Sequence, residues 1–190
     1  MARVVKAFEL GVSSAQDIRA FSVAGRYQKG GVDAAVYGGT LCVKNGRAPS
    51  SIFHESKNDE AFIMEDAVQG STEVYICNPD IAAFCVNEAQ GTSYRQGSGN
   101  LGNAVPKEFL ARFTLATVGT SCKFGLGNFV SEPTPAMTYA VIGTGANAGL
   151  LVAQAARPAS GFALEIEEKE HFTEGAYDGG AGYRCRVISV

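Results

Sequence analysis

Apolar and polar residues alternate along several short stretches of this chain, and a period of two is typical of β-strands. In residues 162–167, Phe162, Leu164 and Ile166 alternate with smaller or charged residues. In residues 109–117, one parity is occupied by Phe, Ala, Phe, Leu and Thr, and Phe and Thr favour a strand over a helix. We therefore predict a strand at both places, the one at 162–167 being half exposed.

Other segments rich in β-branched, aromatic or small apolar residues are predicted as strands on the same grounds. They are residues 3–10, which form either a first strand or an extended arm, and residues 40–44, 73–77, 81–86, 122–129, 137–142 and 183–190. Residues 150–156 fit either a strand or a short helix. A helix of about two turns is predicted over 15–21, because Ser14 and Asp17 are spaced as in a capping box.

Glycine, proline and asparagine mark the predicted turns between these segments. Asn45-Gly46 predicts a hairpin turn directly after residues 40–44, because both central positions of a type I′ turn need positive φ. The other predicted breaks are Gly25, Gly30 and Gly31, the turn at Asn78-Pro79-Asp80, the connector at Pro133 and Pro135, and the Gly-rich loops 91–103 and 175–182.

These elements predict an all-β, mainly β fold, a sandwich or barrel of about nine to eleven short strands with one or two short helices. We expect residues 1–190 to form a single β-rich domain, with residues 1–12 as an extended N-terminal arm or first strand. No period of about 20–50 residues indicates a repeat array.

Composition narrows the possible partners. Charged residues make up 18% of the chain, below the usual ~25%, so its surface either contacts neighbouring subunits or is simply neutral. The net charge is −3 and no basic tract is present, which argues against direct binding of nucleic acid. No apolar run of ~18 residues predicts a membrane span, and the charged N-terminus lacks the apolar stretch of a signal peptide.

The five cysteines are odd in number and scattered in spacing: Cys42, Cys77, Cys85, Cys122 and Cys185. Most have apolar neighbours and none forms a Cys-x-x-Cys motif. They are predicted to be buried, reduced thiols in a protein that folds in a reducing cytosol.

Two glycine patterns have the residue spacing of nucleotide-binding loops. Residues 97–102 match G-x-G-x-x-G, yet neither a strand before them nor a helix after them is predicted, so we interpret them as a loop. Residues 143–149 follow a predicted strand, but the segment after them is too short before Arg157-Pro158 for a phosphate-binding helix. We predict a hairpin there and keep a nucleotide site as the alternative.

The remaining chemical candidates are few. His54 and His171 are the only histidines, and neither is placed by sequence beside a thiol, so both are predicted to be solvated. The acidic run 165–170 could supply paired carboxylates, but a strand edge leading into an acidic turn is the favoured interpretation; it could also face a basic patch on a partner. We predict no catalytic, cofactor-binding or metal-binding residues, and no cofactor.

Several segments between residues 74 and 190 follow one another in a distinctive order: 74–79, 97–103, 112–115, 124–129, 161–166, 172–175 and 184–190. This order resembles that of β-rich structural proteins of tailed bacteriophages, of the capsid decoration (cement) or auxiliary head type. The resemblance implies a non-enzymatic virion protein that binds the outer face of a capsid lattice, steadies it against internal pressure and is assembled in the host cytoplasm. Such families carry no catalytic residues.

The sequence therefore leaves three hypotheses for the function. The first is a capsid decoration protein whose partners are the major capsid protein lattice, copies of itself, or both, with contacts through residues 2–10, 91–103 and 175–182. The second is a phage tail-tube or head–tail joining protein. The third is a small hydrolase that uses Cys and His, or a nucleotide-binding enzyme that uses residues 143–149.

Overall fold

The computed structural model describes residues 8–10, 22–49, 60–78, 104–107, 110–174 and 177–190. These residues form fourteen β-strands and two short 3-10 helices, η2 (Leu126–Asn128) and η3 (Gly145–Asn147). The all-β prediction is confirmed, although the strands outnumber the predicted nine to eleven.

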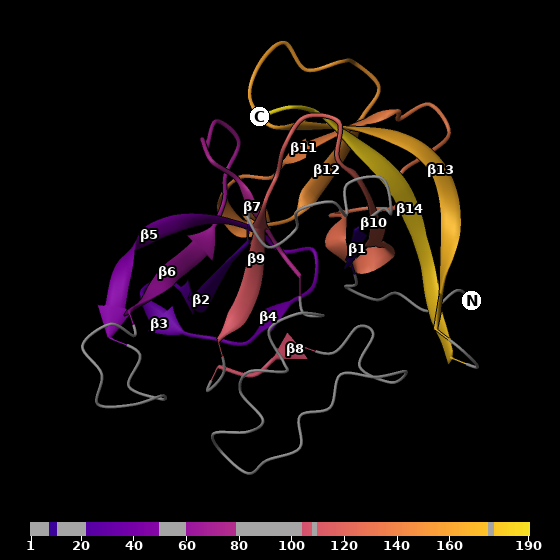
Figure 1. Ribbon diagram of the computed structural model, residues 1–190. Helices are drawn as coiled ribbons and strands as arrows, with labels where there is room; N and C mark the ends of the chain where they lie inside the picture. The colour runs from indigo at the N-terminus through magenta and orange to yellow at the C-terminus, as the bar shows by residue number, and fades with distance from the viewer. Residues whose placement is uncertain (1–7, 11–21, 50–59, 79–103, 108–109, 175–176) are drawn as a thin grey trace.

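One sheet is antiparallel throughout, and we call it the large sheet. Its strands, in spatial order, are β1 (Phe8–Leu10), β10 (Ser121–Gly125), β14 (Tyr177–Ser189), β13 (Ala163–Glu174), β11 (Tyr139–Ile142) and β12 (Leu151–Gln154). The sheet therefore combines one strand from near the N-terminus with five from the C-terminal half of the chain. In Figure 1 its long strands β13 and β14 run down the right-hand side of the molecule.

The second sheet curls into a partial barrel, which we call the barrel sheet. Its order is β3 (Val32–Asp33), β2 (Ser22–Lys29), β6 (Glu60–Asp66), β5 (Leu41–Pro49), β7 (Tyr75–Cys77) and β9 (Ala111–Leu115). An additional antiparallel pairing of β2 with β9 joins the two sides of this sheet. A separate pair, β4 (Val36–Tyr37) and β8 (Ala104–Val105), lies at the lower end of the barrel in Figure 1.

Strands β5 and β7 form a wall shared by two hydrophobic cores. Leu41 and Ile76 belong to the core between the two sheets, which also contains Phe124 and Leu164. Their neighbours along the chain belong to the core inside the barrel, which is built from Tyr27, Val36, Cys42, Met64, Tyr75, Cys77, Val105, Ala111 and Phe113. Because successive side chains on a strand point to opposite faces, both faces of this wall must be apolar, which explains its continuous apolar sequences.

Most of the predicted strands that fall on described residues are present. The structure confirms strands at 40–44, 73–77, 109–117, 137–142 and 183–190, with shifted ends, and it makes the ambiguous segment 150–156 a strand, β12. Residues 122–129 are only partly extended, because β10 ends at Gly125 and η2 follows. The predicted helix 15–21 and strand 81–86 lie outside the described residues.

Asn45-Gly46 does not form the predicted hairpin turn. Strand β5 continues through both residues to Pro49, and the pairing with β6 shifts register between Lys44 and Arg47. Gly46, at φ 95°, provides the positive φ of a β-bulge instead. The dipeptide signal was therefore correct about backbone conformation and wrong about chain reversal.

Two further predictions of broken chain are wrong. Gly25 lies inside strand β2, where a Cβ atom would come 2.5 Å from the Cγ atom of Met64, so glycine permits close packing there. The predicted Gly-rich loop 175–182 is largely strand, because β14 begins at Tyr177 and pairs with β13 through Gly180 and Gly182. At Gly25 and Gly182 glycine is required because Met64 and Phe172 leave no space for a side chain, which a single sequence cannot reveal.

Candidate functional site

The longest strands in the described part of the chain are β13 and β14, and we call their antiparallel pair the β13–β14 ribbon. β11 pairs with β13 only at residues 163–165, and β10 pairs with β14 only at residues 182–186. The two long strands continue past these neighbours and pair with each other as far as Glu174 and Tyr177. The ribbon therefore extends beyond the rest of the large sheet, as its lower end in Figure 1 shows.

The acidic run 165–170 lies inside β13, so the predicted acidic turn is wrong. Its carboxylates meet arginines of β14 across the ribbon. Arg186 lies 2.5 Å from Glu165 (Nη2–Oε2) and 3.4 Å from Glu167 (Nε–Oε1), while Arg184 is 2.7 Å from Glu168 (Nη1–Oε1). These ion pairs, with those of Glu170 described next, form a ladder of alternating charge on one face of the ribbon.

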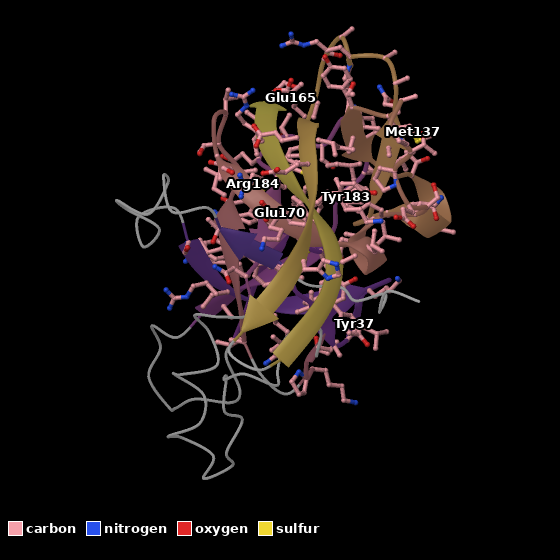
Figure 2. All side chains as sticks on the ribbon, turned by 90° about the vertical axis from the view of Figure 1, so that its right-hand side faces the viewer. Tyr37, Met137, Glu165, Glu170, Tyr183 and Arg184 are labelled. Atoms are coloured by element: carbon pink, nitrogen blue, oxygen red, sulfur yellow. The ribbon has the colours of Figure 1, made fainter. Side chains whose placement is uncertain are left out.

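Glu170 links the ladder to strand β10. It forms an ion pair with Arg184, and its Oε2 lies 3.2 Å from the Nζ of Lys123. Lys123 also covers the ring of buried Phe172, with its Nζ 5.0 Å from the ring centroid. In Figure 2, Arg184 and Glu170 lie on one side of the ribbon and Tyr183 on the other, as strand alternation requires.

Ion pairs on the two faces of the ribbon favour the charged forms of Arg186, Glu132 and Lys169. The hydrogen bond from Arg186 to Glu165 raises the pKa of the guanidinium above its ordinary value. On the opposite face, Lys169 donates a 2.5 Å hydrogen bond to Glu132, which lowers the pKa of Glu132 and raises that of Lys169. The carboxylates of the acidic run are therefore neutralised by bases of the same chain.

The four described cysteines are buried and unbridged. Cys122 and Cys185 lie directly opposite each other on β10 and β14, and Cys42 and Cys77 are in the barrel core. Burial raises the pKa of the thiols of Cys42, Cys122 and Cys185, so these groups stay protonated and are poor nucleophiles. The prediction of buried, reduced thiols is confirmed for these four, while Cys85 lies outside the described residues.

The two histidines give no catalytic constellation in the described residues. His171 is exposed on β13, as predicted, and its backbone carbonyl accepts a 3.2 Å hydrogen bond from Lys123. His54 lies outside the described residues. Within the described part of the chain, no three His, Cys, Asp or Glu side chains are grouped as metal ligands, and no helix is long and apolar enough to cross a membrane.

Residues 143–149 form the predicted hairpin, because β11 and β12 pair antiparallel from Tyr139↔Gln154 to Ile142↔Leu151. A strand follows these residues where a nucleotide site would need a helix. The backbone amides of residues 147–150 donate to carbonyls within the protein, among them the 2.8 Å bond from Gly149 to Ala67. The Gly149 amide thus joins the hairpin to Ala67, which follows β6, whereas the amides of residues 147, 148 and 150 donate to carbonyls within the hairpin itself.

A cavity of about 140 Å³ lies between this hairpin and the end of the barrel. Its polar side is formed by Tyr27, Lys29 and Asp66, and its apolar side includes Val36, Ala148 and Leu150. The Tyr27 hydroxyl donates a 2.7 Å hydrogen bond to Oδ1 of Asp66. Burial and this carboxylate raise the pKa of Tyr27. Usual ligand pockets have volumes of roughly 300 Å³ or more. The cavity is smaller than this and is too small for a nucleotide.

No sequence pattern indicates this polar group. Tyr27, Lys29 and Asp66 come from strands β2 and β6, which pair in parallel, and Gly25 had been interpreted as a chain break just before them. No local spacing brings residues 27 and 66 together. By contrast, the matching charges at Glu165, Glu167, Arg184 and Arg186 were visible, and only their pairing was not predicted.

Of the predicted contact segments, only part is described. Phe8–Leu10 form β1 at the edge of the large sheet, whereas residues 2–7 and 91–103 lie outside the described residues.

No protein-family model matches the chain, and no curated protein or solved structure matches it either.

Proposed function

We propose that this chain is a non-enzymatic structural virion protein that binds and stabilises a bacteriophage capsid, as decoration or cement proteins do. The observation that carries the proposal is the β13–β14 ribbon, which extends past the strands that flank it in the large sheet. An extended ribbon offers a long contact surface without a cavity. We propose that it contacts the capsid lattice, a neighbouring copy of the chain, or both.

The ladder of ion pairs suits this role. Arg184 and Arg186 each contact two carboxylates, so the ribbon is braced before any partner is present. A preorganised surface loses less conformational entropy on binding than a flexible one. Affinity per copy can then be modest, because the symmetry of a capsid repeats each contact many times.

The surroundings of the thiols and carboxylates favour a binding function over a catalytic one. The described thiols are buried with raised pKa values at three positions, and the described carboxylates of the acidic run have basic partners. The mechanism would be mass action: a protein that binds the assembled shell and not its separated subunits stabilises the shell in proportion to its occupancy.

To test the proposal, the purified protein is mixed with expanded phage capsids from which this protein is missing. Co-sedimentation and the melting temperature of the capsids are then measured. We expect saturable binding and a higher melting temperature. Absence of binding to such capsids overturns the proposal. Ring formation by the protein alone, without affinity for capsids, would instead support a tail-tube or head–tail joining protein.

A shortened ribbon tests which surface is used. In this variant an Asn-Gly turn replaces residues 173–179, which leaves the pairing of Phe172 with Gly180 as the last step of the ribbon. We expect at least a tenfold loss of capsid affinity with an unchanged circular dichroism spectrum. Arg157→Gln, on the exposed connector after β12, is the control and should bind like the wild type.

A further inference from the structure

The cavity between the 143–149 hairpin and the barrel end contains an incompletely satisfied carboxylate. Oδ1 of Asp66 accepts the 2.7 Å hydrogen bond from Tyr27. Oδ2 lies 3.7 Å from the Nζ of Lys29, which is beyond ordinary hydrogen-bond distance. The Asp66 side chain is only 15% exposed, whereas that of Lys29 is 69% exposed. An ion pair at this distance with so exposed a lysine contributes little, so Oδ2 can accept a closer partner.

The size and walls of the cavity define what could reach this oxygen. A volume of about 140 Å³ corresponds to roughly five water molecules at ~30 Å³ each. The end of a lysine side chain, a four-carbon stem with its ammonium nitrogen, has about five non-hydrogen atoms. Val36, Ala148 and Leu150 provide apolar wall for the methylene groups, and Asp66 provides the charge.

The arrangement favours an ammonium over other charged groups. An anion would meet the Asp66 carboxylate, and the nearby amides of residues 147–150 already donate within the protein. A guanidinium is best matched by two carboxylate oxygens, but Oδ1 is already bonded to Tyr27. A compact ammonium needs only the second oxygen.

We propose that this cavity is a socket for a primary ammonium on a short aliphatic stem, namely a lysine side chain of a partner protein. The incoming ammonium takes the place of Lys29 at Oδ2 of Asp66, and its stem lies against the apolar wall. Only the identity of that partner, the capsid lattice, rests on the proposed function. The socket itself rests on the geometry of Tyr27, Asp66 and the hairpin.

The test titrates n-butylammonium chloride into ¹⁵N-labelled protein at constant ionic strength and follows amide chemical shifts. We expect saturable shifts at Ala146, Ala148 and Gly149, with a Kd of about 1 mM or weaker for so small a ligand. Tetramethylammonium, which has the charge without the stem, and butyrate, which has the stem with the opposite charge, should give no saturable shifts at these residues. Equal binding of either control compound, or no binding of butylammonium, overturns the proposal.

Two substitutions test whether the Asp66 carboxylate binds an incoming ammonium or has only a structural role. Lys29→Gln removes the competing ammonium and should tighten butylammonium binding about two- to fivefold, a gain that a structural role does not predict. Asp66→Asn keeps an acceptor for Tyr27 and should abolish binding. If Asp66→Asn fails to fold, Lys29→Gln alone decides, because unchanged or weaker binding contradicts the proposal. Arg157→Gln is the charge control.

Capsid binding and butylammonium binding by the wild-type protein separate this inference from the proposed function. If wild-type protein binds capsids but shows no butylammonium binding, the socket is refuted and the capsid role stands. If butylammonium binds as expected but capsids are not recognised, the capsid role is refuted and the socket stands.

Discussion

Gly149 lies so close to Asp66 that a Cβ atom on residue 149 would be 2.5 Å from Oδ1 of the carboxylate. The backbone of Gly149 is held there by two hydrogen bonds, a 2.8 Å bond to the Ala67 carbonyl and a 3.0 Å bond from the Leu41 amide. The hairpin of the large sheet is thus joined to the barrel sheet at the carboxylate that binds Tyr27.

Gly149→Ala should therefore destabilise the protein strongly. The residue has φ 76°, where a side chain costs about 1–2 kcal/mol, and the crowding at Asp66 adds about 1–3 kcal/mol. We expect a loss of about 2–5 kcal/mol in the free energy of unfolding, measured by urea denaturation. Gly145→Ala is the matched control, since Gly145 has φ 58° in the same hairpin but open space around it. Equal losses in both variants would contradict the contact with Asp66.

Stability should fall at alkaline pH. Burial raises the folded-state pKa of Tyr27 and of the Cys42, Cys122 and Cys185 thiols above their values in the unfolded chain. The unfolded chain therefore loses these protons first, from about pH 8.5 for thiols and about pH 10 for tyrosine. The native state then binds more protons, so the free energy of unfolding decreases as pH rises, by up to about 1.4 kcal/mol per pH unit for each group.

Tyr27→Phe tests the tyrosine part of this dependence. The variant should be less stable at neutral pH, by about 1–2 kcal/mol, because the hydrogen bond to Asp66 is lost. Above about pH 10 its stability should fall less steeply with pH than that of the wild type, by about 1.4 kcal/mol per unit. Urea denaturation at several pH values measures both effects, and parallel curves above pH 10 would refute the second.

The four described thiols should be unreactive in the native protein. Cys85→Ser removes the one thiol that lies outside the described residues, so that a thiol reagent such as Ellman's reports only on the buried ones. We expect negligible reaction over minutes in buffer and complete reaction of all four in guanidinium chloride, because a buried, protonated thiol must first be exposed. Rapid labelling of the folded variant would identify a reactive cysteine and revive the Cys–His enzyme hypothesis.

The ion-pair ladder should make a modest contribution to the free energy of unfolding, and this contribution should depend on salt concentration. Arg184→Gln removes contacts with Glu168 and Glu170 and should lower the free energy of unfolding by about 1 kcal/mol at low ionic strength. The loss should shrink in ~1 M NaCl, where charges are screened over about 3 Å. Arg157→Gln should show little change at either salt concentration. A salt-independent loss for Arg184→Gln would mean that packing of the arginine stem matters more than its charge.

Alternation of apolar and polar residues predicted β9, and richness in β-branched, aromatic and small apolar residues predicted β7 and β11; together these patterns were sufficient to predict the fold class. It failed where glycine occurs inside a strand. Gly25 and Gly182 look like chain breaks in sequence, but both lie in strands, where Met64 and Phe172 leave no space for a side chain. Such crowding depends on which strands pair, so the sequence pattern alone indicates a break or loop at these glycines.

The polar group at the cavity could not be predicted for a related reason. Tyr27 and Asp66 meet because β2 and β6 pair in parallel, with Tyr27 opposite Met64. Parallel pairing of two strands leaves no short-range pattern comparable to a hairpin turn. The charge ladder was closer to prediction, since both sets of charges recur along the chain, yet only the antiparallel register of β13 and β14 shows which carboxylate faces which arginine.

The position of β1 has a consequence for synthesis on the ribosome. Phe8 pairs with Phe124, and β10 pairs in turn with β14, so the third strand from this edge of the large sheet ends at Ser189. The N-terminal strand therefore leaves the ribosome long before its partners exist. Ribosomes add about 5–20 residues per second, so Phe8–Leu10 must wait several seconds for the edge that receives them. The barrel strands β2 to β9 precede β10 in the chain and can pair during that interval, so we expect the large sheet to close after the barrel sheet.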